Sequence, residues 1–296
     1  MSGVRRLEYT AEFDGSVDDL LSAAGISSTV RVRLRKEFGL ICKVSEGGEE
    51  PIKIIDCVKR GEKFCIYLKD LDVKPIPKWD YPINIVYQDE DIAVIDKQAG
   101  VAVIPTKRHY GKSLANALAS VWGDFVYRPV NRLDRDTSGL MIVAKNQLAH
   151  SVLAAAHIYR EYVGLCQGEF VGEPSGVIDE PIKRIGLGMK RAVAPDGDRA
   201  VTHYEVIKSY KEYFACRFIL DTGRTHQIRV HTAHIGHPLC CDRLYNPGAR
   251  SIICPDGKVL DRQALHSCRI RFTHPIDGRK MELTSPPPFL PQNDLD

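Results

Sequence analysis

Residues 132–139 (RLDRDTSG) carry two carboxylates and two guanidiniums between an apolar run that ends at Val130 and another that starts at Leu140. The apolar run over residues 140–144 has the composition of an interior strand, so the charged segment should lie at the edge of a core. Charge in such a place costs free energy unless it is paired or used. The pattern favours a catalytic or binding site. The alternative is a turn whose Asp and Arg side chains form surface ion pairs.

A second segment, residues 221–231 (DTGRTHQIRVH), reads as an apolar strand that is densely interrupted by cations and polar groups. Arg229 stands between Ile228 and Val230 and would be awkward to bury alone, but a carboxylate such as Asp134 could pair with it in a bidentate contact. Such a pair would keep the Asp ionised and oriented. An ionised, oriented carboxylate in a pocket can act as a nucleophile.

A zinc site is a competing interpretation of the second segment, because imidazole and thiolate are preferred zinc ligands. Gly236 and Pro238 indicate a turn that would split the ligand set, and the spacing matches no recognised zinc pattern. We therefore expect no metal. The candidate ligands are His226, His231, His234, His237, Cys240 and Cys241.

Composition indicates an ordinary globular protein: 296 residues, 44% hydrophobic and 27% charged, a balance unlike that of disordered or membrane chains. The net charge of +3 permits contact with a polyanion without demonstrating it. Nine cysteines without a Cys-x-x-Cys pair argue against a disulfide framework. The chain has no apolar signal core near Met1 and no run of about 18 apolar residues, so we expect a soluble cytoplasmic protein with no membrane partner.

Residues 1–72 predict a small α/β module. Ser16 followed by Asp19 starts one helix that Gly25 ends, and Ser28 caps a second helix that runs through Phe38. Short strands are expected over residues 40–44, 52–58 and 64–68. Charged helix faces are usually only solvated, but a basic second helix beside a small sheet suggests an RNA-binding module. Its candidate RNA contacts are Arg31, Arg33, Arg35 and Lys36.

Residues 73–82 contain three prolines and predict an extended linker. Residues 83–290 predict an α+β domain, and residues 291–296 a tail. Within the domain, loops rather than regular crossover helices separate the strands, which favours a mixed, largely antiparallel sheet. Helices begin at Ser113 and Asn146. Strands are expected over residues 83–87, 92–95, 140–144, 162–166, 203–207, 214–220 and 270–273.

Taken together, these stretches resemble the RluA family of RNA pseudouridine synthases over residues 83–288. The motifs that carry the resemblance are DIAVIDK (91–97), RLDRDTSG (132–139), REY (160–162), AVTHY (200–204), GRTHQIRVH (223–231) and QALH (263–266). The N-terminal module is loosely similar to the αL-type RNA-binding domain first described in a small-subunit ribosomal protein. This family commonly carries that domain ahead of its catalytic domain.

The resemblance implies a pseudouridine synthase fold and the isomerisation of uridine to pseudouridine in structured RNA, without a cofactor. It implies that Asp134 is the catalytic carboxylate, Arg229 its ion-pair partner and Tyr162 the aromatic that packs on the uracil. Ile228 would line the pocket, and Arg132 would fill the space that the extruded base leaves. We expect a monomer that acts on large-subunit ribosomal RNA or transfer RNA.

Two positions depart from the family pattern. Asn131 stands where His is common, and Gln98 replaces the usual Pro after Lys97. Neither change touches the Asp, Tyr and Arg set. Asp134 could attack the ribose, attack the uracil or act as a base, and Tyr162 is a second candidate for the base. The alternative function is a non-catalytic RNA-binding or ribosome-assembly factor on the same scaffold.

Overall fold

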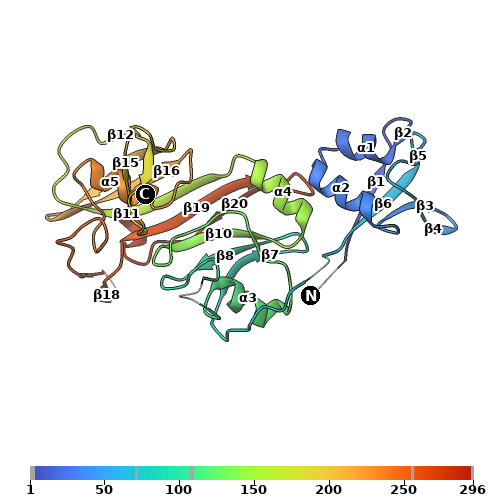
Figure 1. The fold of residues 1–296 in the computed structure, drawn as a ribbon. Coiled ribbons are helices and arrows are strands. Elements are labelled where there is room, and N and C mark those ends of the chain that lie inside the picture. The colour runs from blue at the N-terminus through green and yellow to red at the C-terminus, as the bar shows by residue number, and fades with distance from the viewer. Residues whose placement is uncertain (1–3, 71–72, 107–109, 255–256, 295–296) are drawn as a thin grey trace.

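The structure is a computed structural model that describes residues 4–70, 73–106, 110–254 and 257–294. Figure 1 shows an elongated molecule with a small N-terminal module at one end and a larger sheet domain over the rest. Residues 1–3 and 71–72 of the predicted module lie outside the described residues, and so do residues 295–296 of the predicted tail.

The module folds into a four-stranded antiparallel sheet of order β1-β6-β3-β4 that two helices cover. Ser16 caps the first helix by accepting a hydrogen bond from the backbone N–H of Asp19 (3.2 Å), as the sequence predicts. Its elements are β1 (Arg5–Thr10), β2 (Gly15–Ser16), α1 (Val17–Ala23), α2 (Ser28–Lys36), β3 (Ile41–Ser45), β4 (Gly48–Pro51), β5 (Cys57–Val58) and β6 (Lys63–Leu68).

Several local expectations for the module are wrong. The N-cap of α2 is Ser27 rather than Ser28, and the helix ends at Lys36. The strand expected over residues 52–58 shrinks to β5, because Asp56 accepts a hydrogen bond from the backbone N–H of Lys53 (2.8 Å) and closes a turn there. Strand β4 was not anticipated, since its exposed Gly-Glu-Glu-Pro sequence has no apolar periodicity.

The larger domain, predicted over residues 83–290, is built on one large sheet of order β12-β15-β16-β11-β19-β10-β8-β7, with β20 paired to β19 and β9 to β10. The pairing of β10 with β19 is parallel and the other pairings are antiparallel, which confirms the predicted α+β class and mixed sheet. Its strands in the first half are β7 (Asn84–Gln88), β8 (Ile92–Lys97), β9 (Arg128–Pro129), β10 (Ser138–Ala144) and β11 (Tyr159–Gln167). Those in the second half are β12 (Ser175–Asp179), β13 (Ile182–Arg184), β14 (Arg191–Val193), β15 (Val201–Ser209), β16 (Tyr213–Leu220), β17 (Ile252–Ile253), β18 (Val259–Leu260), β19 (Leu265–Thr273) and β20 (Lys280–Thr284).

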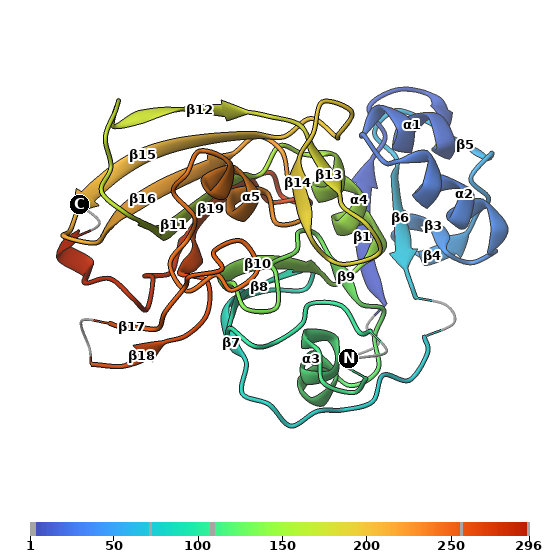
Figure 2. The ribbon, with the colours of Figure 1, turned by 60° about the vertical axis from the view of Figure 1, so that its left-hand side comes forward.

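Helices α3 (Leu114–Trp122), α4 (Gln147–Ala155) and α5 (Gln227–His234) complete the domain, with a short 3-10 helix η2 (Gln292–Asp294) near its end. Both predicted helix starts are confirmed: Ser113 and Asn116 form a capping box, and Asn146 accepts from the backbone N–H of Ala149 (2.9 Å). Figure 2 shows that α5 lies against the β15–β16 half of the sheet and α3 near β7 and β8.

Residues 73–82, before the larger domain, form neither helix nor strand, and they are not detached from that domain. The amide of Asn116 donates to the carbonyl of Pro77 (2.7 Å), and Trp79 stacks on Tyr81 with ring centroids 4.2 Å apart. The hydroxyl of Tyr81 donates to Gln98 (2.8 Å), the residue that replaces the family's usual Pro. These contacts fasten residues 73–82 to the main core.

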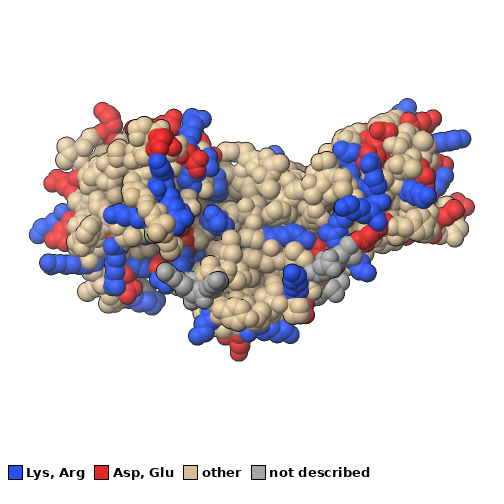
Figure 3. Space-filling view, in the orientation of Figure 1, with Lys and Arg blue, Asp and Glu red and all other residues tan. Residues whose placement is uncertain are grey.

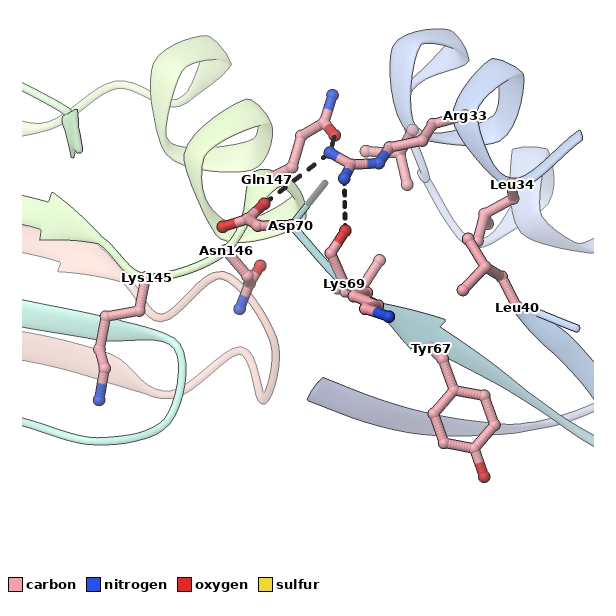
Figure 4. A pocket seen from close by; sticks show the side chains of 11 residues that line it. Arg33, Leu34, Leu40, Tyr67, Lys69, Asp70, Lys145, Asn146 and Gln147 are labelled. Atoms are coloured by element: carbon pink, nitrogen blue, oxygen red, sulfur yellow. Dashed lines mark hydrogen bonds and ion pairs between the residues drawn. The ribbon is translucent and has the colours of Figure 1, made fainter. Parts of the chain in front are cut away.

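The module is held against the larger domain by an interface of apolar and charged side chains (Figure 4). Leu148 of α4 belongs to the apolar cluster of the module. Arg33 reaches from α2 to Gln147 (2.9 Å), and Arg128 of β9 binds Asp70 through two hydrogen bonds (2.8 and 2.5 Å). Arg33 therefore contributes to the interface, whatever its contact with RNA.

One glycine determines how the two halves of the sheet join. Gly139, at the start of β10, pairs with Ser267 of β19 and has φ +110°. A Cβ at Gly139 would overlap the backbone of Ser267. A side chain there would therefore push β19 away from the end of the charged loop.

We expect Gly139→Ala to lower the free energy of unfolding by more than about 2 kcal/mol, because it adds a backbone clash to an unfavourable φ. Gly278→Ala is the matched control: Gly278 also has a positive φ of +74° but faces open space, so its cost should be only about 1 kcal/mol. Urea unfolding of both variants measures the difference. Equal losses of unfolding free energy in the two variants would show that the close approach of β10 and β19 does not add to the cost at Gly139.

Candidate active site

The loop that carries Asp134 connects β9 to β10 and is fastened at its start by Asn131. The amide oxygen of Asn131 accepts a hydrogen bond from the backbone N–H of Ile142 on β10 (2.8 Å). At the other end of the loop, Arg262 donates to the carbonyl of Asp136 (3.1 Å) and to the hydroxyl of Ser138 (3.0 Å). The residue that departs from the family pattern thus anchors the loop to the sheet.

Lys97, at the end of β8, binds the backbone of the same loop. The residue is 2% exposed, and its ammonium donates to three backbone carbonyls, those of Gln98 (2.9 Å), Val101 (3.0 Å) and Arg135 (3.0 Å). Burial lowers the pKa of Lys97 to about 7, with the neighbouring charge of Arg262 acting in the same direction. The three carbonyls satisfy all three N–H groups of the ammonium, so the loop backbone depends on this side chain.

Asp134 meets Arg229 as the sequence predicts, but through a single contact. Arg229 Nη1 donates to Asp134 Oδ2 (2.9 Å). The bidentate partner of Arg229 is Asp242, with Nε to Oδ2 at 2.7 Å and Nη2 to Oδ1 at 2.8 Å. Burial opposes the charge of Arg229, but the hydrogen bonds and charge of Asp242, and then those of Asp134, raise its pKa above the ordinary value. Arg229 is thus a fixed cation between two carboxylates.

Sequence reasoning missed Asp242, which is 1% exposed. A carboxylate directly after two apolar cysteines was an available signal, because an acid in an apolar run needs a cation. Asp242 Oδ1 also accepts from the backbone N–H of Leu244 (3.1 Å) and Tyr245 (3.3 Å), which holds the carboxylate in place.

The element that carries Arg229 is a helix, α5, and not the strand that the sequence indicates. Residues 227–231 alternate polar and apolar side chains, as a strand would, yet all residues from 227 to 232 are buried. The helix starts at His226, and Gln227 orders the preceding loop by accepting from Thr222 (2.8 Å) and from the backbone N–H of Arg224 (2.9 Å). The hydrogen-bond and ion-pair partners that the fold supplies for the polar side chains outweigh the alternating pattern of the sequence.

An apolar wall lies beside the charged groups. Tyr162, Ile228 and Leu133 belong to one buried cluster, with Tyr162 6% exposed. Strand β11 has a bulge between Glu161 and Tyr162, and bulges of this kind redirect side chains near active sites. Burial raises the pKa of Tyr162, so its hydroxyl stays protonated at neutral pH. The cluster therefore brings the predicted Tyr162 and Ile228 together near Asp134.

His226 is a site residue that the sequence considered only as a zinc ligand. It is 7% exposed and has φ +60°, and its Nε2 lies 3.8 Å from Asp134 Oδ2. Its Nδ1 lies 2.8 Å from the hydroxyl of Tyr245. Within the described residues, the groups of three or more side chains placed to hold a metal include none of the six candidate zinc ligands.

Arg132 is exposed, and no described residue forms a hydrogen bond or ion pair with it. It faces a cleft of about 430 Å³ between the β13–β14 hairpin and residues 223–225. Cations outnumber acids around this cleft, whose charged residues are Arg132, Lys183, Arg184, Arg191, Arg224, Asp196 and Asp198. Such a cleft suits a polyanion.

The module's candidate RNA contacts differ in what they bind. Arg31 and Arg35 both pair with Asp18, at 2.9 and 3.0 Å, and Lys36 is exposed. Figure 3 shows Lys and Arg side chains over both lobes and along their junction, mixed with Asp and Glu.

Comparisons with known proteins show which family the chain belongs to. The family model for RNA pseudouridylate synthase matches residues 91–234. A ribosomal large subunit pseudouridine synthase D of Vibrio parahaemolyticus is 38% identical over 273 residues, which cover 86% of this chain and 82% of that protein. The chain belongs to the RluA family of RNA pseudouridine synthases. It is therefore an isomerase whose substrate is RNA.

Other members of the family are comparably similar. YjbO of Bacillus subtilis, named an uncharacterized RNA pseudouridine synthase, is 40% identical over 221 residues, which cover 72% of this chain and 74% of that protein. The solved structure of human RNA pseudouridylate synthase domain containing 1 superposes with a TM-score of 0.57 at 24% identity, over 73% of this chain and 87% of that one. This likeness supports the pseudouridine synthase fold. Among the described residues, no helix has the length and apolarity that spanning a membrane requires.

Proposed function

We propose that this pseudouridine synthase modifies large-subunit ribosomal RNA and that Asp134 is its catalytic carboxylate. The observation that carries the assignment of Asp134 is its contact with Arg229, a buried cation that Asp242 locks in place. The choice of RNA is supported by relatives named as large-subunit enzymes, which align with 86% of this chain, a span longer than the catalytic domain alone.

The reaction breaks the bond from ribose C1′ to uracil N1 and forms one from C1′ to uracil C5, and a proton leaves C5 while N1 gains one. A carboxylate is required beside the sugar and the ring, and the Arg229 guanidinium holds that of Asp134 through Oδ2. Because Arg229 binds Oδ2 and no described residue forms a hydrogen bond with Oδ1, Oδ1 is the oxygen free to react. The protonated hydroxyl of Tyr162 leaves Asp134 as the base for the C5 proton.

The target base must first leave the RNA stack, which costs roughly a few kcal/mol. Stacking on Tyr162, at roughly 1–3 kcal/mol, offsets much of that cost, and Ile228 closes the apolar side of the pocket. Arg132, an exposed residue of the loop, would enter the vacated position in the stack. Its neighbouring cations would hold the backbone phosphates.

Mapping pseudouridines across total RNA tests the choice of substrate. Cells lacking the gene should lose specific pseudouridines in large-subunit ribosomal RNA, and a wild-type copy should restore them while an Asp134→Asn copy should not. Loss confined to transfer RNA would overturn the ribosomal assignment without touching the activity. Monomeric state and cytoplasmic location belong to the same proposal, and sedimentation and cell fractionation check them.

We further propose that the N-terminal module is an RNA-binding domain of the αL type that binds RNA through the exposed end of α2. Replacing both Arg35 and Lys36 by Gln should weaken RNA binding and reduce the slope of log affinity against log salt by roughly 1 per lost phosphate contact. Lys211→Gln, an exposed cation on the β15–β16 turn, is the control and should leave the slope unchanged. Filter binding over a range of salt concentrations measures both, and equal slopes would contradict the proposal.

A further inference from the structure

A histidine that the proposed mechanism does not use lies against the catalytic carboxylate. His226 Nε2 is 3.8 Å from Asp134 Oδ2, the oxygen that Arg229 also contacts. This separation is too long for a hydrogen bond, but catalytic hydrogen bonds in unliganded enzymes are often long and tighten when substrate binds. His226 also has φ +60°, a backbone conformation that costs free energy in a residue other than glycine and occurs often at functional sites.

The protein determines which ring nitrogen of His226 carries the hydrogen. The hydroxyl of Tyr245 accepts a hydrogen bond from the backbone N–H of Arg191 (2.9 Å). The hydroxyl's own hydrogen finds its acceptor in His226 Nδ1 at 2.8 Å, and the described residues offer it no other. Nδ1 is then an acceptor, so the neutral ring carries its hydrogen on Nε2, the nitrogen that faces Asp134.

The surroundings of His226 favour the neutral form of its ring. Burial lowers the pKa of His226, and the cations Arg229 and Arg191 act in the same direction against the carboxylates Asp134 and Asp242. A neutral Nε2–H group can donate to Asp134 Oδ2 without supplying a second positive charge.

We infer that His226 is a positioning residue, which Tyr245 holds in the Nε2–H form so that it and Arg229 together bind Oδ2 of Asp134 and present Oδ1 to the uridine. The inference rests on the proposed role of Asp134. Tyr245 also lies under Arg229, whose guanidinium carbon is 5.1 Å from the centre of the ring. The same tyrosine thus supports both groups that orient the carboxylate.

Two amide substitutions separate this role from a purely structural one. The amide nitrogen of His226→Gln reaches the position of Nε2 and can still donate to Asp134. His226→Asn reaches only the position of Nδ1, so it keeps a contact with Tyr245, and Asn tolerates a positive φ better than Gln does. If His226 has only a structural role, His226→Asn should keep more activity than His226→Gln. If His226 donates to Asp134, His226→Gln should keep more.

We expect His226→Gln to keep kcat within about 10-fold of wild type and His226→Asn to lower kcat on the order of 100-fold at unchanged KM, in tritium release from RNA labelled at uracil C5. Tyr245→Phe keeps the ring beneath Arg229 but removes the hydroxyl that fixes the hydrogen of His226 on Nε2. It should lower kcat by about 3- to 10-fold. Thermal melts establish which variants fold. If His226→Gln does not fold, the kcat of Tyr245→Phe tests the inference in its place.

Several outcomes would overturn the inference. One is a kcat for His226→Asn equal to or above that of His226→Gln, and another is a wild-type pH profile of kcat in Tyr245→Phe between pH 5.5 and 8.5. A parallel measurement on Asp134→Asn distinguishes a failure of the role proposed for His226 from a failure of the role proposed for Asp134. If Asp134→Asn is inactive and the order of the histidine variants is reversed, only the role of His226 is wrong. If Asp134→Asn is fully active, the proposed function of Asp134 fails and the role of His226 fails with it.

Discussion

Replacing Asp134 by Asn is expected to lower the rate of tritium release from uracil-labelled ribosomal RNA by at least roughly 10³-fold. Asparagine has nearly the same shape but no charge, so it removes the group that reacts and leaves the loop anchors on Asn131, Lys97 and Arg262 untouched. RNA affinity should stay close to that of wild type, because phosphates rather than this carboxylate dominate binding.

Asp136→Asn is the matched control for this prediction. Asp136 lies on the same loop, but its carboxylate pairs with Arg135 at the surface (2.8 Å) and contacts no group of the pocket in the described structure. Its loss should change the rate by less than about 3-fold, as for most surface ion pairs. Equal rates for Asp134→Asn and Asp136→Asn would show that the catalytic carboxylate has been misassigned.

Replacing Arg229 by Met should both destabilise the protein and abolish activity. Asp242 would be left buried without its cation, and breaking a buried pair on one side costs about 3–5 kcal/mol. Asp134 would also lose its only ion-pair partner among the guanidiniums of the described residues, so the rate should fall by at least about 100-fold. Urea unfolding and tritium release measure the two effects separately.

The double variant Arg229→Met with Asp242→Asn distinguishes stability from catalysis. Removing the buried negative charge as well should restore a few kcal/mol of stability, about the penalty of the unpaired charge, while activity stays lost. Arg199→Met is the control, because its ion pair with Asp179 is exposed and should contribute less than about 1 kcal/mol. If the double variant were as unstable as Arg229→Met, the destabilisation would not come from Asp242.

Much of the catalytic scaffold could be predicted from the sequence because its signals are local. Five apolar residues in a row over 140–144 have few ways to avoid water, and the structure buries all of them in β10. Asn146 and Ser113 start helices because their side chains bond to backbone groups only three residues away. Arg229 stands between apolar residues, so the sequence also predicted a carboxylate partner such as Asp134, because a buried ion needs a counter-ion.

The helical state of α5 could not be predicted in this way. Its alternating pattern matches a strand, and only the partners that the fold supplies for Gln227, Arg229 and His231 make a helix with every side buried favourable. The same holds for the cations of α2. Their sequence suggests one basic face, but the fold directs Arg33 to the interface with α4 and Arg31 to Asp18.

By itself, the sequence determined the family motifs, the mixed sheet and the residues that could do chemistry, Asp134, Tyr162 and Arg229. Only the tertiary structure decided what completes the site: Asp242 as the bidentate partner of Arg229, and His226 with Tyr245 beside the carboxylate. The physical reason is that a hydrogen bond or ion pair depends on positions in space. Residues more than ninety positions apart in the chain meet at Asp134, and no local pattern encodes which of the available acids and imidazoles the fold brings there.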